Sequence, residues 1–477
     1  MKRSAAMAVG AALGSGCALA KEGRKMPDER PNLVFVFPDE MRQQAMGFLG
    51  RDPVITPNLD RFAAESLFLP NASSNYPVCS PYRAMLLTGK YPHANGVIGN
   101  CTPDSHELGI ELRADGICIS DVLKSGGYDC GYIGKWHLDS ARKPNIPDDG
   151  PEWWDCFIPK NRRHGFDFWH AYNCFDDHLN PHYWTTDAGL NGKIHPRKWS
   201  PEYETDVAID FIRSRGGKRR PNGRPFALFV SHNPPHMPFH MVPDRYVKMY
   251  GDAGPEDLLI RPNADRGLKA ARDGVKNYFA MVTGVDDNFG RLLKCLKDEG
   301  LEDDTIVVFT SDHGEMMGSH ALMHKQLPYE ESFLVPFLVR WPGKIKPGKD
   351  GLHLSVPDLM PTLLALLGVT RGIPKDIQGT DRSPIMLGRG GERPEFAAYY
   401  GISPEAPHLG RRGLRTDRYT FVVAKDREGK RSVVLHDNES DPYQMANVAE
   451  VNPRVVEDLT GKLAGWLKKT HDPFGLS

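Results

Sequence analysis

The chain has 477 residues, enough to bury a large hydrophobic core in one large domain or in two to three domains. Its 60 lysines and arginines balance 61 aspartates and glutamates, and the formal net charge is -1. This balance argues against a nucleic-acid-binding protein or a membrane-surface protein, so a site for an anionic ligand has to be a local concentration of positive charge.

The first twenty residues are typical of a secretory signal peptide. Lys2 and Arg3 precede a short run rich in alanine and glycine, and Ala18-Leu19-Ala20 supplies the small residues of a cleavage site. We therefore expect residues 1–20 to be removed and the mature protein to be periplasmic or extracellular. Lipidation at Cys17 is the alternative, but Gly14 is a poor residue three places before it, so we favour cleavage. No later stretch is apolar for long enough to span a membrane.

Four continuous apolar runs are typical of strands that are buried on both faces of a parallel sheet. They are residues 32–37, 130–134, 226–231 and 305–310. Helical patterns alternate with these runs, over residues 56–66, 111–127, 205–215, 277–300 and 356–369. The alternation predicts an α/β domain in which helices flank a mostly parallel central sheet.

Two regions break this alternation. Residues 140–200 are rich in Trp, His, Asn and Pro without a clear period, so we expect a long irregular insertion, which often forms a functional wall. From about residue 390 the pattern changes to short strands and turns, followed by a helix over 453–469. We therefore predict a main domain over 21–389 and a smaller α+β subdomain with a small antiparallel sheet over 390–477.

Polar side chains follow each of the four predicted strands. They are Asp39 and Glu40, then Lys135 and His137, then His232 and His236, and finally Ser311, Asp312 and His313. One such group alone has an ordinary explanation, such as capping a turn. Four groups together indicate a site, because ligands of open α/β sheets bind beyond the carboxyl ends of the strands.

The residue types at these strand ends suit a metal ion and an anion. The carboxylates of Asp39 and Asp312 favour Ca²⁺ or Mg²⁺ over zinc, and an imidazole such as that of His313 admits Mn²⁺ as well. Lys135 and His137 lie two residues apart, so in an extended chain they face the same side and can bind an anion.

Cys79 stands at the start of a predicted helix that ends near Thr88, with Pro81 in its first turn. Taken alone it is a buried small hydrophobe, half of a disulfide, or a reactive group. The free N–H groups of a helix N-terminus stabilise negative charge, and Arg83 can brace an oxyanion one turn later. For the remaining cysteines the sequence allows two roles, core packing or an occasional disulfide, and none of them has C-x-x-C spacing. They are Cys101, Cys118, Cys130, Cys156, Cys174 and Cys295.

These residues resemble the sulfatase family, whose fold is similar to that of alkaline phosphatase. Cys79-Ser80-Pro81-Tyr82-Arg83 matches the family pattern C-x-P-x-R. Further matches are the Gly-Lys-Trp-His-Leu segment within 127–138, the Pro-His-x-Pro segment within 233–239, the block 305–343 and the C-terminal signature at 435–449. The resemblance covers about residues 31–450 and implies a sulfatase catalytic domain with an alkaline-phosphatase-like sheet over 21–389.

The resemblance implies a modified residue and a metal ion. Cys79 would be oxidised to Cα-formylglycine by a formylglycine-generating enzyme or an anaerobic sulfatase-maturating enzyme. One hydroxyl of the hydrated aldehyde would attack sulfur, and the other would then expel the sulfate, which an ordinary serine or cysteine cannot do. Asp39, Asp312 and His313 would bind a divalent ion, expected to be Ca²⁺ with Mg²⁺ or Mn²⁺ as alternatives, together with the modified Cys79. Glu40 stands where many members carry a second acidic ligand.

The resemblance also implies roles for the basic residues. Arg83 would steady the formylglycine, and His137 would hydrogen-bond its hydrate. Lys135 and Lys325 would bind sulfate oxygens, and His236 would protonate or contact the leaving oxygen. A metal and two lysines lower the cost of charge that builds up on a sulfate ester as its bond breaks.

Two alternatives remain at this stage. A phosphodiesterase or phosphonate monoester hydrolase of the same superfamily would use the same formylglycine with an Asp-His metal pair. An inactive homologue that binds sulfated glycans would keep the fold, although the intact site residues argue against it. The expected substrates are sulfated carbohydrates or aryl sulfates. Several residues of the 140–200 insertion would either shape the leaving-group pocket or pack within the loop: Trp153, Trp154, Trp169, His182 and Trp184.

Overall fold

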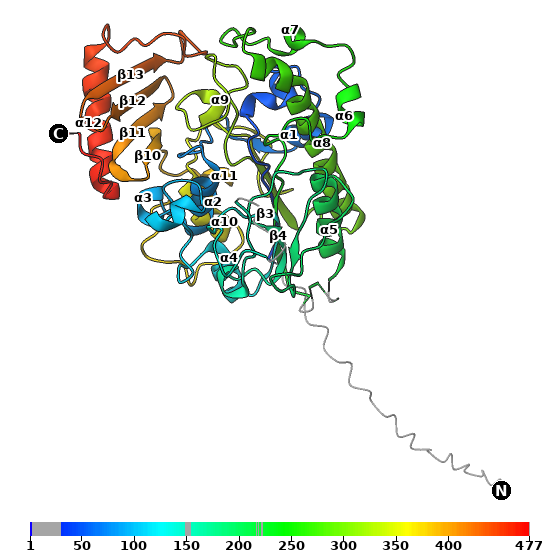
Figure 1. The fold of residues 1–477 in the computed structure, drawn as a ribbon. Helices are drawn as coiled ribbons and strands as arrows, with labels where there is room; N and C mark the ends of the chain where they lie inside the picture. The colour runs from blue at the N-terminus through cyan, green and yellow to red at the C-terminus, as the bar shows by residue number, and fades with distance from the viewer. Residues whose placement is uncertain (2–29, 148–153, 216, 218, 221–222, 477) are drawn as a thin grey trace.

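The computed structural model describes residue 1 and residues 30–147, 154–215, 217, 219–220 and 223–476. Except for Met1, the predicted signal peptide lies outside these described residues. In the described part, nine strands form the main sheet (Figure 1). From one edge to the other they are β5 Trp184–Thr185, β4 Phe168–Tyr172, β3 Asp129–Lys135, β6 Phe226–Ser231, β1 Asn32–Val36, β7 Thr305–Thr310, β8 Phe337–Arg340, β2 Leu67–Phe68 and β9 Gly348–Lys349.

The centre of this sheet is parallel, as the apolar runs predicted. Strands β4, β3, β6, β1 and β7 run in the same direction, and Phe35 of β1 lies in register with Phe229 of β6 and Val308 of β7. Every residue of β1, β3, β6 and β7 is buried. Strands β5, β8 and β2 add antiparallel pairs toward the edges. The predicted α/β fold class is therefore confirmed.

Helices cover both faces of the sheet (Figure 1). Leu33 and Phe35 of β1 pack into one core with α2 (Cys79–Thr88), α4 (Ile119–Ser125) and α10 (Leu359–Leu366). Val34 and Val36 point the other way, into a core with α1 (Pro57–Ala64), α5 (Ser200–Arg213) and α8 (Lys269–Asp298). The shorter helices are α3 Pro92–Asn95, α6 Asp244–Lys248, α7 Pro255–Leu258, α9 Glu330–Phe333 and α11 Ser383–Met386, and 3₁₀ turns span Gln43–Ala45, Gly47–Leu49, Asp104–Leu108, Lys160–Arg162 and Val356–Asp358.

A second, four-stranded antiparallel sheet follows near the C-terminus. Its strands are β10 Phe396–Ser403, β11 Ala406–Thr416, β12 Tyr419–Lys425 and β13 Arg431–Asp437. Helix α12 (Pro453–Thr470) covers one face of this sheet, and the other face packs against Phe333 and Leu334 of the main domain. The sequence pattern predicted this α+β arrangement.

Four sequence predictions need correction. The helix expected over 111–127 covers only Ile119–Ser125, because the Asp121 carboxylate accepts a hydrogen bond from the Cys118 amide and so caps the helix there. The insertion expected over 140–200 contains β4 and β5, whose aromatic sequence gave no aliphatic signal. The helices expected from 205 and 277 begin earlier, at Ser200 and Lys269.

The cysteines that the structure describes are buried, unpaired residues of the protein interior. Cys79, Cys101, Cys118, Cys130, Cys156, Cys174 and Cys295 are all buried, and none of them forms a disulfide with another described cysteine.

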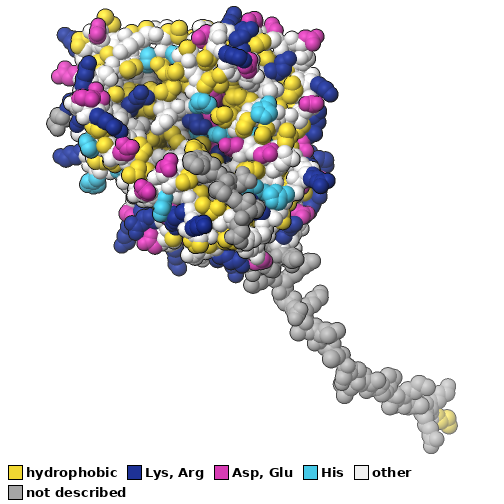
Figure 2. All heavy atoms as spheres, in the orientation of Figure 1, with side chains coloured by type: hydrophobic (Ala, Val, Ile, Leu, Met, Phe, Trp, Pro, Cys, Tyr) yellow, Lys and Arg dark blue, Asp and Glu magenta, His cyan; other side chains and the backbone are white. Residues whose placement is uncertain are grey.

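Figure 2 shows lysine and arginine side chains interspersed with aspartate and glutamate over the visible face. None of the helices among the described residues has both the length and the apolar composition that crossing a membrane requires.

Candidate active site

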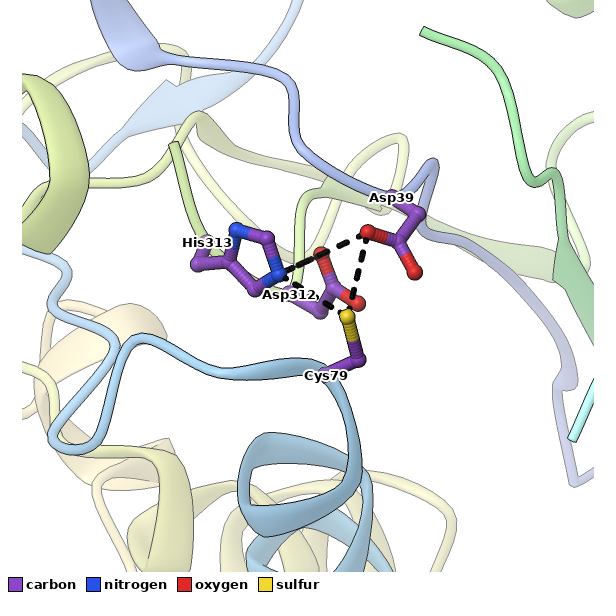
Figure 3. A group of neighbouring side chains, drawn as sticks. All are labelled: Asp39, Cys79, Asp312 and His313. Carbon is purple, nitrogen blue, oxygen red and sulfur yellow. Dashed lines mark hydrogen bonds and ion pairs between the residues drawn. The ribbon is translucent and has the colours of Figure 1, made fainter. Parts of the chain in front are cut away.

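Four side chains from three separate parts of the chain meet beyond the carboxyl ends of the central strands (Figure 3). Asp39 follows β1, Cys79 opens α2, and Asp312 and His313 follow β7. Their ligand atoms all lie within 4.8 Å of one another. The Cys79 Sγ is 3.5 Å from Asp39 Oδ1 and 3.3 Å from His313 Nε2. The sequence predicted this set, and the topology brings it together.

Local structure holds these residues in place. The loops after β1 and β7 are tied together, because the Ser311 hydroxyl donates to the Pro38 carbonyl at 2.9 Å and accepts from the Met41 amide at 3.0 Å. Cys79 is the first residue of α2, and Gly89 follows the last residue of this helix in the left-handed conformation that glycine adopts at low cost. Cys79 therefore projects from a helix N-terminus toward the strand ends.

Two buried cations offset the charge of the two aspartates. The Arg83 guanidinium lies 3.1 Å from Asp39 Oδ2 and 3.0 Å from Asp312 Oδ2. The Lys135 ammonium lies 2.8 Å from Asp39 Oδ2. Burial by itself would raise the pKa of Asp39, but Lys135 and the other nearby cations hold it well below its usual range. Burial, together with the charge of Asp39, raises the pKa of Asp312.

The group fits a divalent cation. The Nδ1 of His313 donates to the Gly314 carbonyl at 2.9 Å, which leaves the Nε2 lone pair facing Asp39 and Asp312 at 3.4 and 3.6 Å. Two carboxylates and one imidazole, all with 0% exposed side chains, are a donor set that Ca²⁺, Mg²⁺ or Mn²⁺ accepts.

Glu40 lies apart from this group, beside two other predicted site residues. Its Oε1 is 3.0 Å from the Lys325 ammonium, and its Oε2 is 3.3 Å from His236 Nε2. Burial, moderated by Lys325 and reinforced by Glu315, raises the pKa of Glu40 to about 8. The ligand atoms of Glu40, Asp39 and His236 lie within 4.8 Å of one another, in a group distinct from the one that Asp39 forms with Cys79, Asp312 and His313. The role of Glu40 as a metal ligand stays a prediction.

The two predicted site histidines lie at different depths. His137 is 1% exposed, and neither of its ring nitrogens has a hydrogen-bond partner among the described residues. The side chain of His236 is 13% exposed and that of Lys325 is 15% exposed, so both lie toward the solvent side of the site. Burial, together with nearby lysines, holds the pKa of both His137 and His236 well below the ordinary value, so both rings are neutral at pH 7 in the unliganded protein.

Two positioning residues were missed by the sequence analysis. Glu315 Oε1 accepts hydrogen bonds from the amides of Met317 and His324 at 2.9 and 2.7 Å, which closes the loop that presents Lys325. Asn233 accepts a hydrogen bond from the Lys135 ammonium at 3.0 Å. Both residues lie within the polar groups that follow β7 and β6, so position after a strand is the signal that could have found them.

The aromatic residues of the 140–200 region divide between the core and the site. Trp169 and Trp184 are 1% exposed and pack inside the protein, and His182 pairs with the Asp155 carboxylate at 2.5 Å. These three residues do not line a leaving-group pocket. The half-buried ring of Trp154 lies 6.1 Å from the ring of His137, whereas Trp153 lies outside the described residues.

The unmodified thiol is poorly suited to attack an ester. Burial, together with the charge of Asp39, raises the pKa of Cys79. The thiolate, which is the nucleophilic form of cysteine, is therefore disfavoured at this position. The site needs a nucleophile that does not depend on thiol ionisation.

Comparisons with known proteins agree with this geometry. The family model described as Sulfatase matches residues 31–369, and the model described as N-sulphoglucosamine sulphohydrolase, C-terminal, matches residues 318–471. The chain is 42% identical to an endo-4-O-sulfatase of Bacteroides thetaiotaomicron, with 96% of each chain covered. It is 35% identical to an ulvan-active sulfatase of Formosa agariphila, over 88% of this chain and 77% of the relative.

A solved structure extends the likeness to three dimensions. A sulfatase homologue from Bacteroides fragilis superposes with a TM-score of 0.89 at 42% identity, covering 95% of this chain and 98% of the other. The chain belongs to the sulfatase family. It is accordingly a sulfuric ester hydrolase, and the predicted alkaline-phosphatase-like fold is confirmed.

Proposed function

We propose that this protein removes sulfate from sulfated glycans and that it does so in the periplasm or outside the cell. The names of the two relatives support a glycan substrate, because one is an endo-4-O-sulfatase and the other an ulvan-active sulfatase. The signal-peptide pattern of residues 1–20 supports export. The observation that carries the proposal is the convergence of Asp39, Asp312 and His313 on Cys79.

Two groups would complete the site. Cys79 would be converted to Cα-formylglycine by a formylglycine-generating enzyme or an anaerobic sulfatase-maturating enzyme, and Asp39, Asp312 and His313 would hold a divalent ion. We expect Ca²⁺, with Mg²⁺ and Mn²⁺ as alternatives that elemental analysis of the purified protein distinguishes. The aldehyde hydrate supplies the nucleophile, and the ion supplies positive charge for the sulfate oxygens.

The chain's own residues would bind the ester and manage its charge. Lys135 and Lys325, whose charges both act on Cys79, would bind sulfate oxygens. Arg83 would keep the residue-79 side chain and the two aspartates in one arrangement. His137, whose two ring nitrogens have no hydrogen-bond partner in the described part of the chain, would hydrogen-bond the hydrate. His236 would give a proton to the bridging oxygen as the sugar leaves.

Peptide mass spectrometry of residue 79 tests the proposal. In protein made together with a maturating enzyme, the Cys79 peptide is expected to carry an aldehyde in place of its thiol. The variant Cys79→Ala is expected to lose more than about 1,000-fold in kcat/KM, because it has no nucleophile. Cys295→Ala, at a buried cysteine in α8, serves as the matched control and should stay active. An unmodified thiol in a host that matures other sulfatases would instead favour a glycan-binding protein without activity.

The substrate class is tested by a panel of defined esters. The panel contains mono- and disulfated oligosaccharides, 4-nitrophenyl sulfate, a phosphodiester and a phosphonate monoester. We expect the highest kcat/KM for a sulfated oligosaccharide. Faster turnover of the phosphodiester or the phosphonate would contradict the proposal.

A further inference from the structure

The mouth of the site carries a carboxylate that the proposed reaction does not use. Exposure of the side chains rises outward through the site: Asp39 and Lys135 are 0% exposed, His236 is 13%, Lys325 is 15% and Asp176 is 40% exposed. An ester whose sulfate reached the buried lysine would therefore direct its leaving group toward His236 and Asp176. Asp176 comes from the 140–200 region, just after β4.

Hydrogen bonds fix Asp176 relative to the sulfate-binding residues. The Asn233 side-chain amide donates to Asp176 Oδ1 and to the Phe175 carbonyl, both at 2.9 Å. The same Asn233 accepts from the Lys135 ammonium at 3.0 Å. The Nε2 of His178 lies 2.9 Å from the His236 carbonyl oxygen, and this contact links the segment after β4 to the loop after β6. A single side chain, Asn233, thus connects the lysine at the base of the site to the aspartate at its mouth.

Asp176 is not needed to orient the His236 ring. The Nδ1 of His236 donates to the Met237 carbonyl at 2.7 Å, whereas Asp176 Oδ1 lies 3.5 Å from that nitrogen. The shorter contact sets the tautomer. Within the described part of the chain, no donor contacts the second oxygen, Oδ2, of Asp176. This oxygen is therefore available to a bound molecule.

Resting on the proposed function, we infer that Asp176 determines specificity by accepting a hydrogen bond from a hydroxyl of the leaving sugar. A carboxylate forms short, strong hydrogen bonds with hydroxyl groups. The same negative charge repels a second sulfate placed near the scissile one. The preferred ligand is a sugar that carries a single sulfate and a free hydroxyl close to the ester bond.

Two variants separate these effects. Asp176→Ala removes both the hydrogen bond and the charge, whereas Asp176→Asn keeps an acceptor and removes the charge. Asp177→Ala is the matched control, because Asp177 is a neighbouring carboxylate that accepts hydrogen bonds from Asn180 rather than from residues of the site. Three probes are compared: the monosulfated oligosaccharide that the parent enzyme desulfates fastest, its counterpart with a second sulfate on the same sugar, and 4-nitrophenyl sulfate.

We expect Asp176→Ala to lower kcat/KM for the monosulfated probe by about 10- to 100-fold, mainly through KM, because a hydrogen bond to a charged group is lost. Turnover of 4-nitrophenyl sulfate should change less than about twofold, since it has no sugar hydroxyl. Asp176→Asn should lower the ratio of kcat/KM for the monosulfated probe to kcat/KM for the disulfated probe, compared with the parent enzyme. Asp177→Ala should match the parent on all three probes.

Other outcomes overturn the inference. An equal loss on 4-nitrophenyl sulfate would show that Asp176 acts on His236 or on folding, and an unchanged monosulfated rate would show that it does not touch the sugar. If the parent desulfates no sugar but does hydrolyse 4-nitrophenyl sulfate, the proposed glycan function fails first, and the inference falls with it.

Discussion

At the scale of single residues, Arg83 explains how the site keeps two carboxylates buried next to each other. One terminal nitrogen of its guanidinium, Nη2, bridges Asp39 and Asp312. The other terminal nitrogen, Nη1, donates to the Lys135 carbonyl at 2.7 Å and to the Ser231 hydroxyl at 2.6 Å. The planar fork of arginine suits such a bridge, which the single ammonium of lysine cannot reproduce. The cations and aspartates are therefore arranged before any substrate arrives.

In the proposed reaction, His236 is the residue whose protonation changes. Burial, together with Lys325 and Lys135, lowers its pKa, so the free protein holds the ring neutral at pH 7. A sulfate ester between the lysines offsets their charge and favours the protonated ring. Proton donation matters most when the leaving group is strongly basic, as a sugar alkoxide is.

We predict that His236→Ala lowers kcat by about 100-fold or more on a sulfated sugar. The loss on 4-nitrophenyl sulfate should be much smaller, because nitrophenolate leaves without a proton. Steady-state kinetics on both esters measure the difference. Equal losses on the two esters would rule out the acid role.

At the scale of secondary-structure elements, α8 caps α1. Thr56, the residue before α1, makes no capping hydrogen bond through its side chain. Instead, the Asp286 carboxylate of α8 accepts hydrogen bonds from the amides of Asn58 and Leu59 at 3.1 and 2.6 Å. Gly290, one turn later, permits the close approach, because a Cβ there would lie 2.4 Å from the Asn58 side chain.

This cap predicts a pH dependence of stability. Burial raises the pKa of Asp286 to about 6, from an ordinary value of about 4. Because the folded state holds this proton more tightly than the unfolded state, its contribution to stability is full below about pH 4 and is lost as the pH rises through about 6. The loss amounts to at most about 2–3 kcal/mol.

Urea unfolding of the parent and Asp286→Asn between pH 4.5 and 7 checks this prediction. The free energy of unfolding of the parent, relative to that of the variant, should fall across this range and level off above pH 6. Asp287→Asn is the control, because Asp287 accepts only from the Tyr246 hydroxyl among the described hydrogen bonds. A constant difference between parent and Asp286→Asn would contradict the prediction.

At the scale of the whole molecule, a buried ion pair holds the C-terminal subdomain together, and a hydrogen bond joins its sheet to the main domain. Arg412 of β11 pairs with both oxygens of Asp472 at 2.7 and 3.0 Å, and both side chains are 0% exposed. The Tyr399 hydroxyl of β10 donates to the Gln326 carbonyl at 2.9 Å, directly after Lys325. The subdomain therefore supports the loop that carries a site lysine.

We predict that Arg412→Ala lowers the free energy of unfolding by about 3–5 kcal/mol, because Asp472 is left as a buried, unpaired charge. Adding Asp472→Asn should recover part of the loss, since the remaining charge is removed. Arg418→Ala, at an exposed ion pair, should change stability by less than about 1 kcal/mol. Chemical denaturation of the three variants measures these changes, and an Arg412→Ala protein as stable as the parent would refute the role of the pair.

Much of the fold could be predicted because its signals are local. The runs that became β1, β3, β6 and β7 are buried on both faces and are therefore continuously apolar. Strand β4 lacked that signal, since its burial is achieved with aromatic and histidine side chains. The first turns of α8 were missed because charged residues interrupt the apolar stripe there.

The chemical type of the site can be inferred from the amino-acid sequence: hard oxygen donors, histidines and lysines after buried strands, and a cysteine at a helix N-terminus. The folded arrangement was needed to show that Asp39, Cys79, Asp312 and His313 converge. It was also needed to show that Glu40 faces Lys325 and His236 and that Asp176 lies at the mouth of the site. The physical reason is that residue type and period are local, whereas strand order and side-chain direction depend on packing between distant segments.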